Sequence, residues 1–146
     1  MILSAAVIKS RLADDSRNGD LVIRPFGQSC LQPASYDLRV ADEALLIRGQ
    51  CNLVPTLEWV ELPSDIAATL RTRSSFGRRG ILLGAGYVDP GFRGQLTLCC
   101  TNMGTDDILV AEGDRIVQMI FHAVDGGDEV YTGRYQDSSG VVHARE

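Results

Sequence analysis

The sequence predicts an all-β fold, a barrel or sandwich that carries one short helix at its N-terminus. Short apolar segments recur along the chain and are separated by turns that mostly contain glycine. Apolar side chains at helical spacing occur only near the start. Many short strands combined with a single helix are typical of β-barrels and sandwiches.

The helix is predicted to begin after Ser4. The Ser4 side chain can cap the first turn, and Ala5, Ile8 and Leu12 then fall on one helical face. The polar run 14–19 is expected to end the helix.

Eight strands are predicted after the helix, each bounded by turn residues. They lie at 21–26, 35–40, 43–47, 58–62, 66–73, 94–100, 107–111 and 114–121. Because no repeat, linker or low-complexity stretch divides the chain, we expect a single domain spanning residues 1–146. The polar segment 131–146 is predicted either to fray or to fold over a ligand as a lid.

Composition excludes several classes of function. The 146 residues carry a formal net charge of −5, which argues against sequence-independent nucleic-acid binding. No apolar run is long enough to span a bilayer, and the N-terminus lacks the pattern of a signal peptide. We therefore expect a cytoplasmic protein that binds neither nucleic acid nor membrane.

The cysteines are predicted to be free and mostly buried thiols. Their spacing matches no zinc motif, and the chain has only two histidines to complete one. A disulfide framework is not expected in a chain of this size with so few cysteines. The four are Cys30, Cys51, Cys99 and Cys100.

The central segment 71–95 combines positive charge, hydroxyl groups and glycine. Arg73, Ser74, Ser75 and Arg78 offer the forked cationic donors and hydroxyls that suit phosphate oxygens. The alternative interpretation is a solvated arginine run on a turn. Glycines are densest here, which allows the backbone to approach a ligand closely.

Asp89 is the carboxylate within this glycine-rich segment. In the sequence Asp-Pro-Gly it can be an ordinary turn residue. Next to bound phosphates it can instead orient and deprotonate a water molecule. Mg2+ would then be held mainly by the phosphate oxygens rather than by protein ligands.

Four motifs, in this order, resemble those of the dCTP deaminase and dUTPase superfamily. They are LQPASYDLRV at 31–40, RTRSSFGRRGI at 71–81, GYVDPGFRGQLTL at 86–98 and EGDRIVQMIF at 112–121. The N-terminal helix, LVIRPF and LPSDIAATL are similar to the deaminase branch in particular. The resemblance implies a distorted β-barrel that forms a homotrimer, with active sites at subunit interfaces and Mg2+ carried by a deoxynucleoside triphosphate.

The resemblance also implies roles for individual residues. Asp89 would activate water, and Phe92 would lie against the deoxyribose. The backbone of Ala85 and Gly86 would meet the pyrimidine. Asp37 would contact the ion only through water. Ser74, Ser75 and Arg78 would hold the triphosphate, with Arg73 beside them and Gln118 near the phosphates. Apart from the resemblance, Arg134 and Tyr135 in the polar tail would bind the nucleotide if the tail folds down as a lid.

Two departures from the family pattern affect the chemistry. The deaminases carry a proton-shuttling glutamate ten residues after the aspartate, where this chain has Cys99. Strand alternation places Cys99 with Gln95 and Thr97 on the more polar face of its strand, and a thiol is a poor substitute for a carboxylate. The base-recognition hairpin between RGI and VDPG is also two residues shorter than the pattern.

Three functions therefore compete. The first is hydrolysis of dUTP to dUMP and diphosphate, which relies on Asp89 and the phosphate-binding motif. The second is deamination of dCTP to dUTP and ammonia with another general base. The third is a non-catalytic trimer that binds deoxynucleotides, which Cys99 and the short hairpin together suggest.

Overall fold

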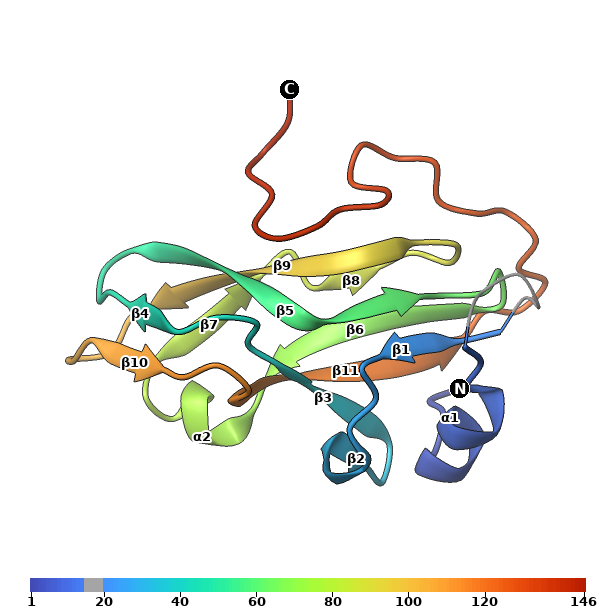
Figure 1. The fold of residues 1–146 in the computed structure, drawn as a ribbon, viewed down its shortest axis with the longest axis horizontal. Coiled ribbons are helices and arrows are strands. Elements are labelled where there is room, and N and C mark those ends of the chain that lie inside the picture. The colour runs from blue at the N-terminus through green and yellow to red at the C-terminus, as the bar shows by residue number, and fades with distance from the viewer. Residues whose placement is uncertain (15–19) are drawn as a thin grey trace.

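The computed structural model describes residues 1–14 and 20–146 and confirms the predicted all-β class (Figure 1). The N-terminal helix α1 spans Ala5–Arg11, and the Ser4 hydroxyl accepts a hydrogen bond from the Val7 amide at 3.3 Å. Ile8 is fully buried, as its place on the apolar face predicts. Leu12, which was predicted to lie on the same helical face, is instead the C-cap that follows the helix. The stop predicted at 14–19 lies mostly outside the described residues.

Eleven strands are present in the described part of the chain, more than the eight predicted. Two single helical turns, η2 (Gln28–Cys30) and α2 (Ser74–Gly77), accompany them. The strands are β1 (Val22–Arg24), β2 (Leu31–Gln32), β3 (Ser35–Arg39), β4 (Ala44–Leu46), β5 (Cys51–Glu61), β6 (Ile66–Thr72), β7 (Ile81–Gly84), β8 (Tyr87–Val88), β9 (Arg93–Asn102), β10 (Ile108–Val110) and β11 (Arg115–Ala123).

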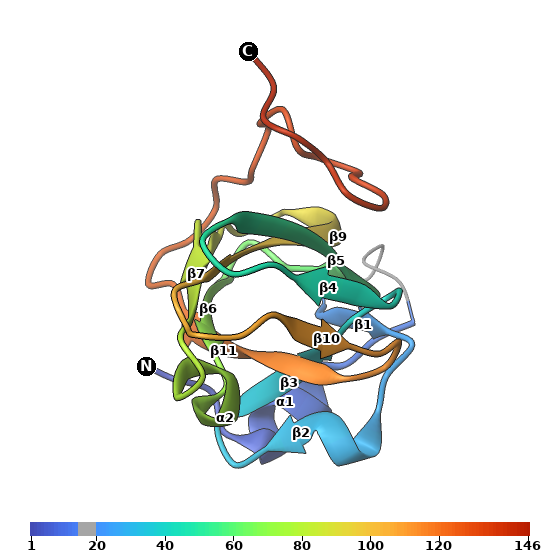
Figure 2. The same ribbon diagram turned by 90° about the vertical axis from the view of Figure 1, so that its left-hand side faces the viewer.

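The strands form two facing sheets and a small ribbon. One sheet has the order β2-β3-β11-β6-β8, the other the order β1-β5-β9-β7, and β10 pairs with β4. The sheets curve around a common interior in the end-on view (Figure 2). A bridge between Val40 and Thr56 links the two sheets without a continuous ladder. The result is a distorted barrel whose interior is filled by apolar side chains, the largest of which include Tyr36, Leu38, Leu98, Met119 and Phe121.

Strand β5 is much longer than its predicted segment 58–62, because Pro55 does not interrupt it. Between Pro55 and Trp59, four residue steps on β5 oppose two on β9, so the strand bulges there. Proline is tolerated at such irregularities because the ladder already lacks a hydrogen bond. The Thr56 hydroxyl in the bulge donates to the Glu58 carbonyl and accepts from the Leu96 amide, at 2.9 and 3.0 Å.

The expected hairpin between 81 and 88 is not a hairpin in the structure. Strand β7 pairs with β9, whereas β8 pairs with β6 in the other sheet. Ala85, at φ 53°, and Gly86 carry the chain across between the sheets. A side chain at Gly86 would meet the Leu70 carbonyl oxygen at 2.8 Å, which explains why glycine is required.

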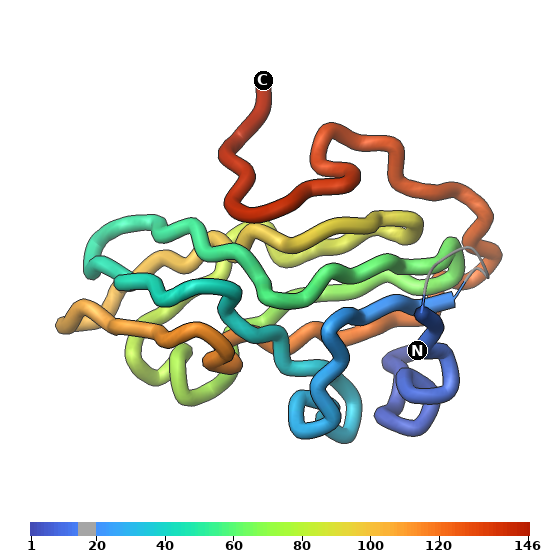
Figure 3. Tube along the Cα trace, viewed as in Figure 1, coloured from blue at the N-terminus to red at the C-terminus, as the bar shows by residue number. Residues whose placement is uncertain are grey.

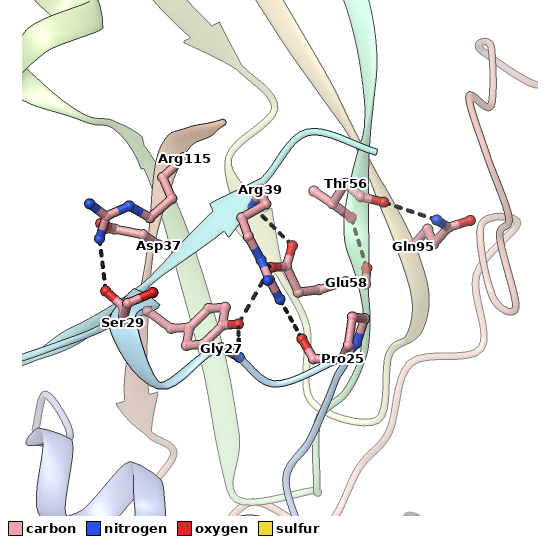
Figure 4. A network of polar contacts seen from close by, with 10 residues as sticks. Pro25, Gly27, Ser29, Asp37, Arg39, Thr56, Glu58, Gln95 and Arg115 are labelled. Carbon is pink, nitrogen blue, oxygen red and sulfur yellow. Dashed lines mark hydrogen bonds and ion pairs between the residues drawn. The ribbon is translucent and has the colours of Figure 1, made fainter. Parts of the chain in front are cut away.

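A buried ionic network joins strand β3 to strand β5 (Figure 4). Glu58 is fully buried, and its carboxylate accepts from the side-chain Nε and the backbone amide of Arg39 at 2.7 and 2.9 Å. Arg39 also donates to the Pro25 carbonyl at 2.6 Å. Burial raises the pKa of the neighbouring Tyr36 hydroxyl, which therefore remains protonated.

The C-terminal segment runs back across the outer face of β9 (Figure 3). All four cysteines are free thiols, as predicted. Within the described ranges, none of the helices is long and apolar enough to cross a bilayer.

Candidate functional site

A cavity of about 410 Å³ lies between strand β9 and the C-terminal segment. Its walls are mainly apolar, and Asp89 is the one carboxylate among its lining residues. Of the residues expected at the site, Ala85, Asp89, Phe92 and Tyr135 line it. The remaining lining residues are Leu53, Tyr87, Val88, Gln95, Leu96, Thr97, Cys99, Tyr131, Ser138, Val142 and Ala144.

Asp89 is exposed at the edge of this cavity, directly after β8. Its backbone is fixed by a turn in which the Phe92 amide donates to the Asp89 carbonyl at 3.2 Å. Gly91, at φ 79°, completes the turn, and a side chain there would strike Val130 at 2.5 Å. Among the described residues, no cation forms an ion pair with Asp89. The carboxylate is therefore available to a ligand or to water.

Phe92 both lines the cavity and belongs to the core. It is 7% exposed, and its ring packs edge-to-face against Tyr131 with centroids 5.8 Å apart. The two interpretations of Phe92, as a core aromatic and as a ligand-facing surface, are thus compatible.

Cys99 faces the cavity, as the alternation of β9 predicts. Leu96, Leu98 and Cys100 are buried on the inner face, whereas Cys99 is half-buried on the outer one. Burial raises the pKa of the Cys99 thiol, and the nearby Cys51 thiol raises it further. The group is therefore a neutral thiol near pH 7 and offers no carboxylate-like acceptor.

The C-terminal segment is attached to strand β9 and forms one wall of the cavity. The Asp137 carboxylate pairs with Nε and NH2 of Arg93, at 2.7 and 2.9 Å. The side-chain amide of Gln136 donates to the Gly91 carbonyl at 2.9 Å. Tyr135 lines the cavity, but Arg134 does not, because its side chain donates to the Arg145 carbonyl at 2.8 Å.

A second cluster surrounds α2, and it is cationic. Ser74 and Ser75 lie in its single turn and Arg78 is its C-cap, all three of them exposed. Arg73 precedes the turn and donates from NH1 to the Arg115 carbonyl at 3.1 Å. This arrangement presents hydroxyls and a guanidinium together, which are groups that bind phosphate oxygens.

Asp37 supports this cluster from a buried position. It is 1% exposed, and its carboxylate lies 3.1 Å from Arg73 Nε and 3.5 Å from Arg115 NH1. Within the described chain, these ion pairs are not accompanied by hydrogen bonds to either carboxylate oxygen. Burial raises the pKa of Asp37, and the two arginines oppose that shift. A cation at Asp37 would have to displace this positive charge.

Gln118 lies in register with Asp37 across the sheet. In the ladder it stands between Asp37 on β3 and Arg71 on β6. It is therefore next to the cationic cluster, as its expected place near phosphates requires. Arg71 and Arg115 were not among the expected site residues, although both lie within the motifs at 71–81 and 112–121.

The two clusters do not meet within one chain. Ser74, Ser75, Arg78 and Gln118, all in the described part of the structure, do not line the cavity that contains Asp89. In both ribbon views α2 lies on one side of the barrel, and β9 with the C-terminal segment lies on the other (Figures 1 and 2). A site that uses both clusters requires residues from more than one copy of the chain.

Comparison with known proteins identifies the family. A family model described as dCTP deaminase-like matches residues 41–124. A dCTP deaminase from Thermococcus sibiricus is 36% identical over 143 residues, which covers 87% of this chain and 92% of that protein. The chain belongs to the dCTP deaminase-like family.

Other members and neighbours support this assignment. A "dCTP deaminase, dUMP-forming" from Aquifex aeolicus is 33% identical over 174 aligned positions, covering 99% of this chain and 94% of that protein. The native dUTPase of EIAV superposes with a TM-score of 0.63 at 21% identity, over 80% of this chain and 98% of its own. This family therefore shares its fold with the dUTPases, and its members act in nucleotide metabolism.

The residues of this family member do not form a metal cage. Across residues 1–14 and 20–146, no group of three histidine, cysteine or acidic side chains is placed to hold a metal ion.

Proposed function

We propose that this chain hydrolyses dUTP to dUMP and diphosphate. The observation that supports the proposal best is the position of Asp89, an unpaired carboxylate at the edge of a mainly apolar cavity. The strand wall of the same cavity bears the neutral thiol of Cys99 instead of a second carboxylate. One base for activating water is thus present, whereas a proton shuttle for the pyrimidine ring is not.

In this proposal the nucleoside occupies the cavity. Phe92 lies against the deoxyribose, and the backbone of Ala85 faces the base. Gly86 does not line the cavity, and its carbonyl accepts from the Leu70 amide at 2.7 Å. Asp89 accepts a proton from a water molecule as the water oxygen bonds to the α-phosphorus. The bond from the α-phosphorus to the bridging oxygen breaks, and its electron pair leaves with the diphosphate. The proton on Asp89 is then released to solvent.

The triphosphate is held by the cationic cluster of a second copy of the chain. Ser74, Ser75 and Arg78 bind its oxygens, with Arg73 held in place by Asp37 and with Gln118 alongside. Two patches that do not coincide in one chain meet when copies join head-to-tail, and such a heterologous contact gives a ring when the rotation between copies closes. We infer a homotrimer with one site at each interface.

Mg2+ belongs to the substrate in this scheme, as the magnesium complex of the triphosphate. When bound, it offsets phosphate charge. The residues of the chain act around it: Ser74, Ser75 and Arg78 orient the phosphates, and Asp89 positions water.

Deamination of dCTP is the second candidate, because the relatives that match most of this chain are named dCTP deaminases. It requires a proton shuttle at the ring. The neutral thiol of Cys99 stands on the wall where the resemblance places a glutamate, so this candidate ranks below hydrolysis.

The test is to incubate the pure protein and Mg2+ with dUTP, dCTP, dTTP or UTP, and to separate the products by chromatography. We expect dUMP and diphosphate from dUTP, little turnover of UTP, and no ammonia from dCTP. Formation of dUTP or dUMP from dCTP would establish the deaminase instead. Saturable binding of a deoxynucleotide without any turnover would establish a non-catalytic binding protein.

A further inference from the structure

The wall that the C-terminal segment adds to the cavity depends on one side chain of strand β9. The carbonyl oxygen of the Gln95 side chain accepts from the Gly140 amide at 2.7 Å and from the Ser139 hydroxyl at 3.2 Å. Two further contacts support it. The Gln95 backbone amide donates to the Ser138 carbonyl at 2.8 Å, and the Thr97 side-chain hydroxyl accepts from the Val142 amide at 2.9 Å.

The orientation of the Gln95 amide is fixed from the barrel side. Its Nε2 donates to the Thr56 carbonyl at 2.9 Å, as Figure 4 shows. Because a carbonyl can only accept, the nitrogen must face Thr56, and the oxygen must face the C-terminal segment. Thr56 is itself fully buried in the bulge of β5 and is bonded to Glu58 and Leu96. The acceptor presented to the segment is therefore preorganised by the core.

The backbone also makes room for the segment at this point. Gly94 has φ 150° and forms a bridge with Ser138. A Cβ at Gly94 would lie 2.9 Å from the Ser138 nitrogen, so a larger residue would push the segment away. Ser138 is 6% exposed, which shows that the segment is packed at this contact rather than lying loosely on the surface.

The attachment through Arg93 is of a different kind. Arg93 and Asp137 form a two-point ion pair, but both groups are exposed to solvent, where such pairs contribute little. The bond from the Gly140 amide to Gln95, by contrast, is partly buried next to the cavity, where an unmade hydrogen bond costs more.

We propose that Gln95 is the positioning residue that holds residues 138–144 over the cavity and thereby sets how tightly a nucleotide is retained. The inference rests on the proposed function for the identity of the ligand. The segment contributes Ser138, Val142 and Ala144 to the cavity wall. Release of the segment opens this side of the cavity to water. It does not move Asp89, which follows β8 and precedes the turn that leads into β9.

The test compares Gln95→Leu with Gln50→Leu, a matched control in which an exposed glutamine far from the segment is replaced. Amide hydrogen exchange is measured first, with no nucleotide present. We expect Gln95→Leu to speed exchange at Gly140 and Val142 while amides of β11 keep their protection, and Gln50→Leu to leave all of them unchanged. Unchanged exchange at Gly140 would overturn the positioning role, and equally faster exchange throughout would show a general loss of stability instead.

Nucleotide retention is measured next, as the Kd for α,β-imido-dUTP and as kcat and KM for dUTP. Loss of two to three hydrogen bonds predicts a rise in Kd and KM of about tenfold with kcat changed less than about threefold. A faster Gly140 exchange with unaltered Kd and KM would overturn the link to retention. If the wild type neither binds nor hydrolyses dUTP, the proposed function fails, and the exchange comparison still decides whether Gln95 positions the segment.

Discussion

The cavity beneath the C-terminal segment and the cationic turn around α2 are built in opposite ways. In the cavity, apolar side chains form most of the wall, and the Gln95 amide is bonded within the same chain, whereas the Asp89 carboxylate is unpaired among the described residues. Around α2, the side chains of Ser74, Ser75 and Arg78 are exposed, and they form no hydrogen bond or ion pair with any other described residue.

This difference explains how the two regions can serve one reaction. An apolar cavity suits a base and a sugar, but it cannot bind a polyphosphate. Free hydroxyls and guanidinium groups suit a polyphosphate, but they form no enclosed site. Each region supplies what the other lacks, and their separation within a chain is the reason to propose a site between copies.

The largest effect is expected in the cavity, for Asp89→Asn. A general base contributes roughly 10²–10⁴-fold to rate, so kcat for dUTP should fall by that factor. The Kd for α,β-imido-dUTP should change little, because the amide keeps the size of the side chain. Asp128→Asn, a change of an exposed carboxylate close to Asp89, is the control and should retain full activity. Undiminished turnover by Asp89→Asn would show that Asp89 in this cavity is not the general base.

Cys99→Glu should alter the chemistry of the cavity. It places a carboxylate on the wall that now bears a neutral thiol, and general acid–base catalysis then becomes available to the ring. We expect release of ammonia from dCTP at a rate roughly a hundredfold above that of Cys99→Gln, which has the same size without the charge. Equal rates for the two variants would show that Cys99 is not what limits deamination.

Arg78→Ala tests the cationic region. Hydrogen bonds to charged groups are worth about 1.5–3 kcal/mol, so KM for dUTP should rise roughly 10- to 150-fold and lose part of its dependence on salt. Arg79→Ala removes an equal charge from the next position and should have a much smaller effect. Similar losses in both variants would indicate general attraction rather than a defined phosphate contact.

Asp37→Asn should have the smallest effect, and it concerns stability. Burial raises the folded-state pKa of Asp37 above its unfolded value, so the carboxyl group stabilises the fold at acidic pH. That contribution is lost as the pH rises through the folded pKa. The free energy of unfolding of the variant relative to wild type should therefore increase with pH, by at most about 1.4 kcal/mol per pH unit. Urea unfolding between pH 4 and 7 measures it, with the exposed Asp42→Asn as control. A difference that decreases with pH would contradict the buried assignment.

Much of the cavity was predictable because strand alternation is a local property. The pattern of residues 94–100 correctly placed Cys99 outward with Gln95 and Thr97. The same pattern could not show that Gln95 and Thr97 bind the C-terminal segment, because those contacts join residues 45 positions apart. Whether segment 131–146 frays or packs depended on them, and the sequence left both outcomes open.

The errors in the fold have a similar origin. The strand predicted at 58–62 begins at Cys51 in the structure, because the ladder partner β9 accommodates Pro55 in a bulge. The residues from 81 to 88 have the composition of a hairpin, yet their two halves find different partners, β9 and β6. Short strands such as β2 and β8 carry too few residues for a periodic signal. In each case a partner distant in sequence decided the structure.

The central claim is that Asp89 of one chain acts on a phosphate held by Arg78 of another, and mixing two impaired variants tests it most directly. The assay holds dUTP below the wild-type KM, so that each variant by itself is nearly inactive. Asp89→Asn and Arg78→Ala chains are unfolded together and refolded as a 1:1 mixture. In a ring of copies, random assembly pairs an intact Asp89 with an intact Arg78 at about a quarter of the interfaces, so we predict recovery of about a quarter of wild-type activity. Mixed assemblies that stay as inactive as the two separate variants would contradict the account.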